Sequence, residues 1–199
     1  QGRILDKSGR ETWSLEKYAF LAPAMNRDMS PPGIMPTSAP DTVNPSLWRQ
    51  SQLVLHDGLY QVTERIYQVR NADLSNMTII EGDTGLIVAD PLISAENAAA
   101  ALHLYYEHRP RKPVKTIIYS HSHVDHYGGV LGVTTEKDVK SGAVQIIAPE
   151  GFLRAAMYEN VMSGTVMGRR AQYMYGGLLP PSPTGHVGAG LGLKNSSGA

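Results

Sequence analysis

The residues best suited to chemistry form one short run, His121-Ser-His-Val-Asp-His126. Imidazole nitrogens and carboxylate oxygens are ordinary zinc ligands. In an extended segment, His121 and His123 point to the same side and can bind one metal together. Asp125 and His126 follow where a strand gives way to a loop, and can turn toward a second metal about 3.5–4 Å away. The run therefore predicts a centre with two zinc ions, in which Asp125 is also the candidate catalytic residue.

A polar loop that is rich in His by chance is the alternative interpretation of this run. The chain has 7 His in all, and three of them fall within six residues beside an Asp. This concentration favours a metal site. Gly128 and Gly129 follow directly, and we expect them to let the backbone turn sharply after the ligands.

Alternating and β-branched residues around the run predict the elements that position it. Ser94 is a good N-cap for a helix whose residues Ala98, Ala101, Leu102 and Tyr105 share one face. The order strand, helix, strand predicts a crossover unit in a largely parallel or mixed sheet. We expect strands at 59–69 (one or two), 76–81, 86–90, 114–119 and 144–148, a turn at 82–85, and a helix at 97–108.

The two ends of the chain have a different character. Residues 1–50 are predicted to be an extended N-terminal arm, because five prolines break up any regular element, and residues 51–199 to be the first part of a catalytic domain. Residues 150–175 are predicted to form one long helix. The tail, 179–199, is rich in Gly, Pro and Ser and is predicted to be loop, held by polypeptide outside this chain. The prolines of the arm are Pro31, Pro32, Pro36, Pro40 and Pro45.

Charge and composition exclude several classes of partner. Lys plus Arg and Asp plus Glu each number 18, so the net charge is zero and gives no general attraction to nucleic acid or anionic membrane. No apolar run reaches the roughly 18 residues of a membrane span. The chain has no Cys, which excludes disulfides and thiolate metal sites. We expect a secreted or periplasmic protein, although no signal peptide is visible.

The pattern H-x-H-x-D-H resembles the signature of the metallo-β-lactamase fold superfamily. The hairpin turn at 82–85 and the buried strand ending at Asp90 resemble the lead-in to that signature. Three longer strings are similar to the alkyl sulfatase branch, and the similarity extends over most of residues 41–193. These strings are Asn44-Pro-Ser-Leu-Trp-Arg49, Asp73-Leu-Ser-Asn-Met-Thr78 and Arg169-Arg-Ala-Gln-Tyr-Met-Tyr-Gly176.

This resemblance implies an α/β fold, an αββα sandwich of which the chain holds the first half. It implies two Zn²⁺ ions, with the first two His on one and the Asp-His pair on the other. The remaining ligands, an acidic residue and a further His, lie downstream in the family. We therefore expect the remaining polypeptide of the same protein to supply them, in a homodimer formed through a later helical domain.

Other residues are weaker candidates. Asp90 can support the ligands by accepting a His N–H, or can simply cap its strand. Arg169 and Arg170 can bind a sulfate, although a solvated helix face is the more common use of such residues. The Met and Tyr residues of 157–175 suit an alkyl chain, but core packing is their commoner role. We interpret His56, His103, His108 and His186 as surface residues.

Three functions remain open at this point. The first is hydrolysis of alkyl sulfate esters, which the resemblance implies. The second is another hydrolase reaction on the same fold, by a lactonase, a thioesterase or a phosphodiesterase. The third is a fragment that is inert by itself and serves as a structural part of a larger assembly.

Overall fold

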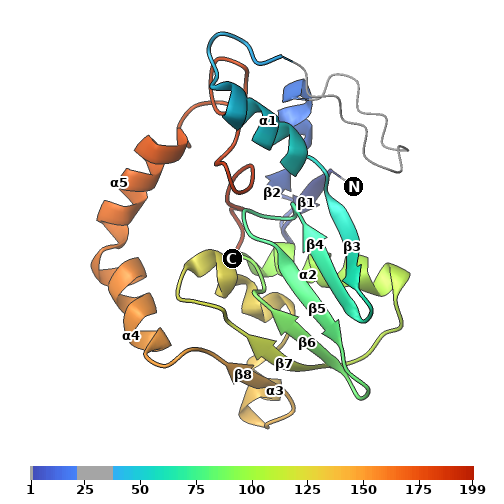
Figure 1. Cartoon of the computed structure of the whole chain (residues 1–199). Helices are drawn as coiled ribbons and strands as arrows, with labels where there is room; N and C mark the ends of the chain where they lie inside the picture. The colour runs from blue at the N-terminus through green and yellow to red at the C-terminus, as the bar shows by residue number, and fades with distance from the viewer. Residues whose placement is uncertain (1, 22–37) are drawn as a thin grey trace.

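The computed structural model describes residues 2–21 and 38–199 of the chain (Figure 1). A six-stranded sheet in the order β3-β4-β5-β6-β7-β8 forms its centre, and β1 and β2 form a separate hairpin. The strands are β1 (Arg3–Leu5), β2 (Glu11–Ser14), β3 (Gly58–Thr63), β4 (Ile66–Arg70), β5 (Met77–Glu81), β6 (Leu86–Ala89), β7 (Val114–Ile118) and β8 (Gln145–Ile147). The α-helices are α1 (Pro45–Val54), α2 (Ala95–His108), α3 (Glu136–Lys140), α4 (Phe152–Met157) and α5 (Gly164–Tyr175).

The sheet is mixed, as the sequence predicts. Strands β3 to β6 pair antiparallel as a meander, whereas β6, β7 and β8 pair parallel. Helix α2 makes the crossover from β6 to β7. Burial alternates along β5 and β6, so that one face of each strand lies in the core. The fully buried residues of this core include Met77, Ile79, Leu86, Val88 and Ile117.

Helix α2 covers one face of the sheet and buries the predicted side chains Ala98, Ala101, Leu102 and Tyr105. The short 3-10 helix η3 (Gly128–Gly132) packs closely against it. A Cβ at Gly129 would lie 2.2 Å from the carbonyl oxygen of Pro91. Neither Gly128 nor Gly129 has a positive φ, so the turn after the histidine run does not depend on a left-handed glycine conformation. Glycine is needed here for close backbone approach.

The described part of the N-terminal region is more regular than an extended arm. It contains the β1–β2 hairpin, the 3-10 helix η1 (Glu16–Leu21) and the start of α1. Pro45 begins α1, capped by the Asn44 side chain, because Pro is well tolerated in a first helical turn. The boundary at residue 50 falls inside this helix. Pro31, Pro32 and Pro36 lie outside the described residues.

The tail is loop, but the expectation that outside polypeptide must hold it is wrong. Val187 and Leu193 are buried in a second core with Trp13, Tyr18 and Trp48. Backbone hydrogen bonds also fix its end, for example from the amide of Ala95 to the carbonyl of Ala199 over 2.7 Å. The chain's own N-terminal segment therefore supplies much of the contact surface.

His186 belongs to this second core and is not a surface residue. It is 6% exposed, and its Nδ1 lies 2.9 Å from the hydroxyl of Tyr18. Burial, and to a smaller extent the charge of Lys194, lowers the pKa of His186. No local pattern predicts this contact, because Tyr18 lies 168 positions away from His186.

The expected long helix of 150–175 is broken. Helix α4 runs into a π-helical turn, η4 (Tyr158–Met162), and α5 restarts after Ser163. The expectation that the apolar residues of this segment pack in a core is also wrong for most of them. Leu153 is 74% exposed, Met162 77% and Tyr173 94%. We call residues 152–175 the apolar arm; in Figure 1 it stands apart from the sheet.

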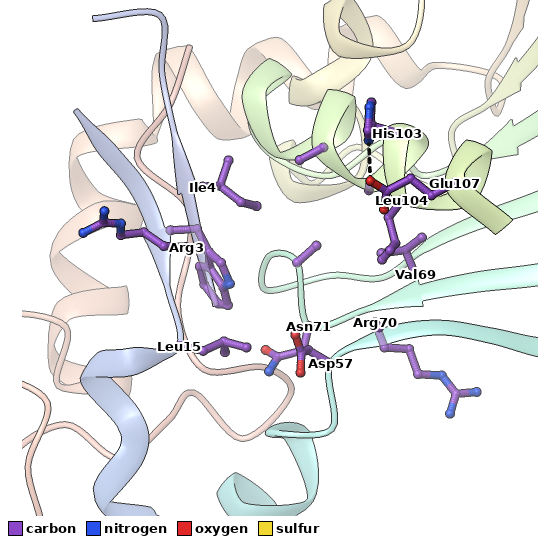
Figure 2. Close-up of a pocket in the computed structure, with 15 residues that line it drawn as sticks. Arg3, Ile4, Leu15, Asp57, Val69, Arg70, Asn71, His103, Leu104 and Glu107 are labelled. Carbon is purple, nitrogen blue, oxygen red and sulfur yellow. Dashed lines mark ion pairs between the residues drawn. The ribbon is translucent and has the colours of Figure 1, made fainter. Parts of the chain in front are cut away.

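No helix of the described residues is long and apolar enough to cross a membrane. A cavity of about 480 Å³ lies between the β1–β2 hairpin, the end of β4 and α2. Figure 2 shows the residues that line it. His103 and Glu107, which form an ion pair, are among the residues that line this cavity. None of the predicted metal ligands lines this cavity.

Candidate metal centre

The candidate centre lies where two parallel strands end side by side. Ala89 of β6 pairs with Ile118 of β7, so the residues that follow each strand meet at one edge of the sheet. Asp90 follows β6, and Ser120 lies just beyond β7. The Ser120 amide donates to Asp90 Oδ1 over 2.8 Å, and the Ser120 hydroxyl donates to Oδ2 over 2.7 Å. These bonds join the two strand ends directly before the histidine run.

The three histidines of the run gather into one cluster. The ring centroid of His121 lies 4.6 Å from that of His123 and 4.1 Å from that of His126. Asp125 and His126 lie in a 3-10 turn, η2 (Val124–His126), which folds His126 back toward His121. Nδ1 of His121 lies 2.9 Å from the Ser120 hydroxyl, leaving Nε2 of His121 without a described partner.

His126 lies between two carboxylates. Its Nε2 is 3.4 Å from Asp125 Oδ2, and its Nδ1 is 3.0 Å from Asp90 Oδ2. Asp125 first, and then Asp90, raise the pKa of His126 to about 9. Burial would raise the pKa of each carboxyl, but the hydrogen bond with His126 and the other favourable contacts outweigh it, so both pKa values are lowered. Asp90 and His126 are thus in contact, but Nδ1 of His126 makes no hydrogen bond of good geometry, and the supporting role of Asp90 stays a prediction.

His121 has the opposite electrostatic environment. Burial lowers its pKa, and the neighbouring His126 and His123 lower it further. A neutral imidazole is the form that binds a metal. The cluster thus combines one imidazole kept neutral with one that carries a proton between carboxylates.

Glu159 reaches the cluster from the apolar arm, and the sequence did not predict it. Its Oε1 lies 3.2 Å from Nε2 of His123. Glu159 lies in the π-helical turn η4, and the next residue, Asn160, donates to the hydroxyl of Tyr127 over 3.2 Å. Single π turns inside helices are often found at functional sites. No spacing signal joins Glu159 to a histidine 36 positions earlier.

The donor set fits zinc in chemistry but is incomplete in geometry. Within residues 2–21 and 38–199, no group of three or more His, Asp or Glu side chains is arranged to hold a metal ion. The donor atoms instead satisfy one another, as Asp125 does with His126 and Glu159 with His123. The predicted ligands are therefore neighbours, and their convergence on one or two metal ions stays a prediction.

Arg169 and Arg170 are not brought to the cluster by any described contact. Both are exposed on α5, and no hydrogen bond or ion pair is described for either. Their role in sulfate binding stays a prediction.

Residues 70–193 match the family model of the metallo-beta-lactamase superfamily. The chain belongs to this superfamily, in its alkylsulfatase branch. It is 57% identical over 195 residues to a linear primary-alkylsulfatase of Pseudomonas sp. and 50% identical over 196 residues to an alkyl/aryl-sulfatase of Saccharomyces cerevisiae. Both alignments cover 98% of this chain. The resemblance read from the sequence is thus confirmed.

A solved structure supports the same fold. The stereoselective inverting sec-alkylsulfatase Pisa1 of Pseudomonas sp. superimposes on 100% of this chain with a TM-score of 0.87 and 45% sequence identity. The chain covers only 29% of that structure, and 27% and 28% of the two relatives above. The α/β fold of the superfamily is therefore confirmed, with the chain spanning less than a third of the length of these relatives.

Proposed function

We propose that this chain forms part of a zinc-dependent alkyl sulfatase, which hydrolyses an alkyl sulfate ester to an alcohol and inorganic sulfate. The cluster of three imidazoles and Asp125 at the end of β7 carries this proposal, because it collects zinc-type donors at a strand end. The similarity to alkylsulfatases over almost the whole chain supports the choice of substrate class.

The residues of the chain have distinct roles in this proposal. His121 and His123 hold one zinc ion, and Asp125 and His126 hold the other. Asp90 keeps the His126 ring in place through its contact with Nδ1. Bound zinc supplies Lewis acidity, which makes water a nucleophile near neutral pH and stabilises charge on the ester oxygens.

Two ligands from this chain for each ion are fewer than the three that catalytic zinc sites normally have. The proposal therefore includes an acidic residue and a His from polypeptide beyond this segment. It also includes a homodimer and a secreted or periplasmic location. Arg169 and Arg170 are candidates for binding the sulfate group once such polypeptide is in place.

One observation favours a second possibility for the chain in isolation. No three donor side chains of its described part are arranged to hold a metal, which is expected of a segment that is inert until it is assembled. The same experiment addresses both proposals.

The test compares this chain with a protein that also carries the downstream polypeptide of its relatives. Sulfate release from dodecyl sulfate and bound zinc are measured in both. We expect activity and about two zinc ions per protomer in the longer protein only. His121→Ala and Asp125→Ala should each lower activity at least 100-fold and remove zinc, because each deletes one of few ligands.

His103→Ala is the matched control, since His103 is exposed on α2 and pairs only with Glu107. It should leave activity and zinc content unchanged. A longer protein that hydrolyses a lactone, thioester or phosphodiester but not dodecyl sulfate would contradict the proposed substrate. Full activity of His121→Ala would contradict the proposed site.

A further inference from the structure

Asp73 is a fully buried carboxylate that accepts four hydrogen bonds. The donors are the amide of Leu74 at 2.8 Å, the amide of Ile93 at 3.2 Å, and the amide and hydroxyl of Ser196 at 2.8 and 2.6 Å. A buried carboxylate without such donors would be strongly unfavourable. Burial raises the pKa of Asp73, and the four hydrogen bonds oppose that rise by stabilising the charged form.

The four bonds join three segments that are distant in sequence. Asp73 lies in the β4–β5 loop, Ile93 in the corner between β6 and α2, and Ser196 in the tail. The corner contains two non-glycine residues with positive φ, Asp90 at 56° and Leu92 at 61°. Such conformations persist where surrounding contacts hold them. The bond from the Ile93 amide to Asp73 is one of these contacts, three residues from the carboxylate that touches His126.

The β4–β5 loop also reaches the histidine run directly. The hydroxyl of Ser75, a buried residue, donates to the main-chain carbonyl of Asp125. The backbone of the run is also held by its own short turn, in which the amide of His126 donates to the carbonyl of His123 over 3.0 Å. Ser75 therefore ties the backbone of a predicted metal ligand to a loop 50 positions earlier in the chain.

We propose that Asp73 and Ser75 are positioning residues of the metal centre. Asp73 fixes the β4–β5 loop and the corner that contains Asp90 as one unit. Ser75 holds the backbone of Asp125 in the position from which the Asp125 carboxylate contacts His126. Neither residue touches substrate. We call the hydrogen bonds of Asp73 and Ser75 to these segments the clamp. An effect of the clamp on zinc affinity rests on the proposed function, but its effect on the backbone does not.

The first test uses Ser75→Ala, which removes one hydroxyl and no charge. Hydrogen exchange of the amides of residues 123–127 is measured in the metal-free chain, and zinc affinity is measured in the longer protein by competition with a chromophoric chelator. We expect exchange in this segment to be at least tenfold faster. Where zinc binds, we expect affinity to be about 10–100-fold weaker, the usual effect of losing a residue that supports a metal ligand.

Asp73→Asn provides the second variant, because an amide offers its N–H groups to donors and cannot accept all four bonds. It should accelerate exchange in residues 90–93 as well as in 123–127. Ser141→Ala is the matched control, since the Ser141 hydroxyl also donates to a main-chain carbonyl, that of Asp138, but does so away from the cluster. It should leave both segments and zinc affinity unchanged.

A further readout separates positioning from general stability. The visible absorption spectrum of bound Co²⁺ reports ligand geometry and should change in Ser75→Ala but not in Ser141→Ala. A variant with a lower Tm but unchanged exchange at 123–127, unchanged zinc affinity and an unchanged cobalt spectrum would overturn the proposal. If the longer protein binds no zinc, the proposed function is contradicted, and the exchange data from the metal-free chain alone decide for or against the clamp.

Discussion

Protons and metal compete for His126 because it lies between Asp125 and Asp90. Its pKa is raised from 6.5 to about 9 in the metal-free fold. The protonated form therefore contributes stability that is fully present below pH 6.5 and is lost as the pH rises through about 9. Zinc requires the neutral ring, so its apparent affinity should rise over the same range.

We therefore predict that the metal-free chain loses a few kcal/mol of unfolding free energy between pH 6.5 and 9.5, measured by urea denaturation. In the longer protein, chelator competition should show zinc affinity rising with pH by up to about tenfold per unit in this window. Asp90→Asn removes one carboxylate and should shift both transitions to lower pH. A metal-free stability that is constant from pH 6.5 to 9.5 would contradict this account.

At the residue scale, the sequence brought the candidate donors together but did not identify their partners. His121, His123, Asp125 and His126 lie within six positions, and local spacing alone brings them together. Glu159 and Ser75 reach the same run across 36 and 50 positions. Their contacts depend on how loops pack, which no periodicity in one sequence encodes.

At the element scale, the sheet was predictable because each strand carries its own pattern. The register follows from alternating burial in β5 and β6 and from the short turns that join the antiparallel strands. The break in the long helix was not predictable in this way. Residues 150–175 contain no proline, and the π-helical turn η4 lies where Glu159 and Asn160 contact the cluster and Tyr127.

The end of β5 is joined to the end of α2 by a partly buried ion pair, in which Glu81 is buried and Arg109 is more exposed. Arg109 donates to both carboxylate oxygens of Glu81, over 2.7 and 3.0 Å, and the Tyr105 hydroxyl donates over 2.7 Å. The hydrogen bond from Arg109 is the main reason that the pKa of Glu81 falls to about 2. This depressed pKa contributes stability that is present above pH 4.5 and is lost as the pH falls through about 2.

We predict that Arg109→Met destabilises the chain at pH 7, because it leaves the Glu81 carboxylate, whose side chain is 9% exposed, without its charged partner. Tyr105→Phe should cost about 1 kcal/mol. Lys140→Met breaks an exposed pair with Glu136 and is the control, with an expected cost under about 0.5 kcal/mol. Denaturation curves at pH 7 and pH 3 test this, since the loss in Arg109→Met should be smaller at pH 3.

At the scale of the whole molecule, the apolar arm is the part that the rest of the chain does not cover. Helix α5 buries none of its residues, and apolar side chains remain exposed from Leu153 to Met174. Soluble proteins rarely expose so many neighbouring apolar side chains without a partner surface. Sequence patterning identified these residues as apolar but assigned them to a core, because patterning cannot tell which surface covers a helix.

We predict that the arm drives self-association of the isolated chain. Met162→Glu combined with Tyr173→Glu should raise the concentration at which the chain remains monomeric at least tenfold, measured by analytical ultracentrifugation, because two charges on the arm oppose its burial against a second copy. The Tm should change little, since both side chains are already solvent-exposed. Leu131→Glu is the control, because Leu131 is 60% exposed but lies outside the arm, on η3. Equal solubilisation by Leu131→Glu would show that added charge, and not the arm, governs association.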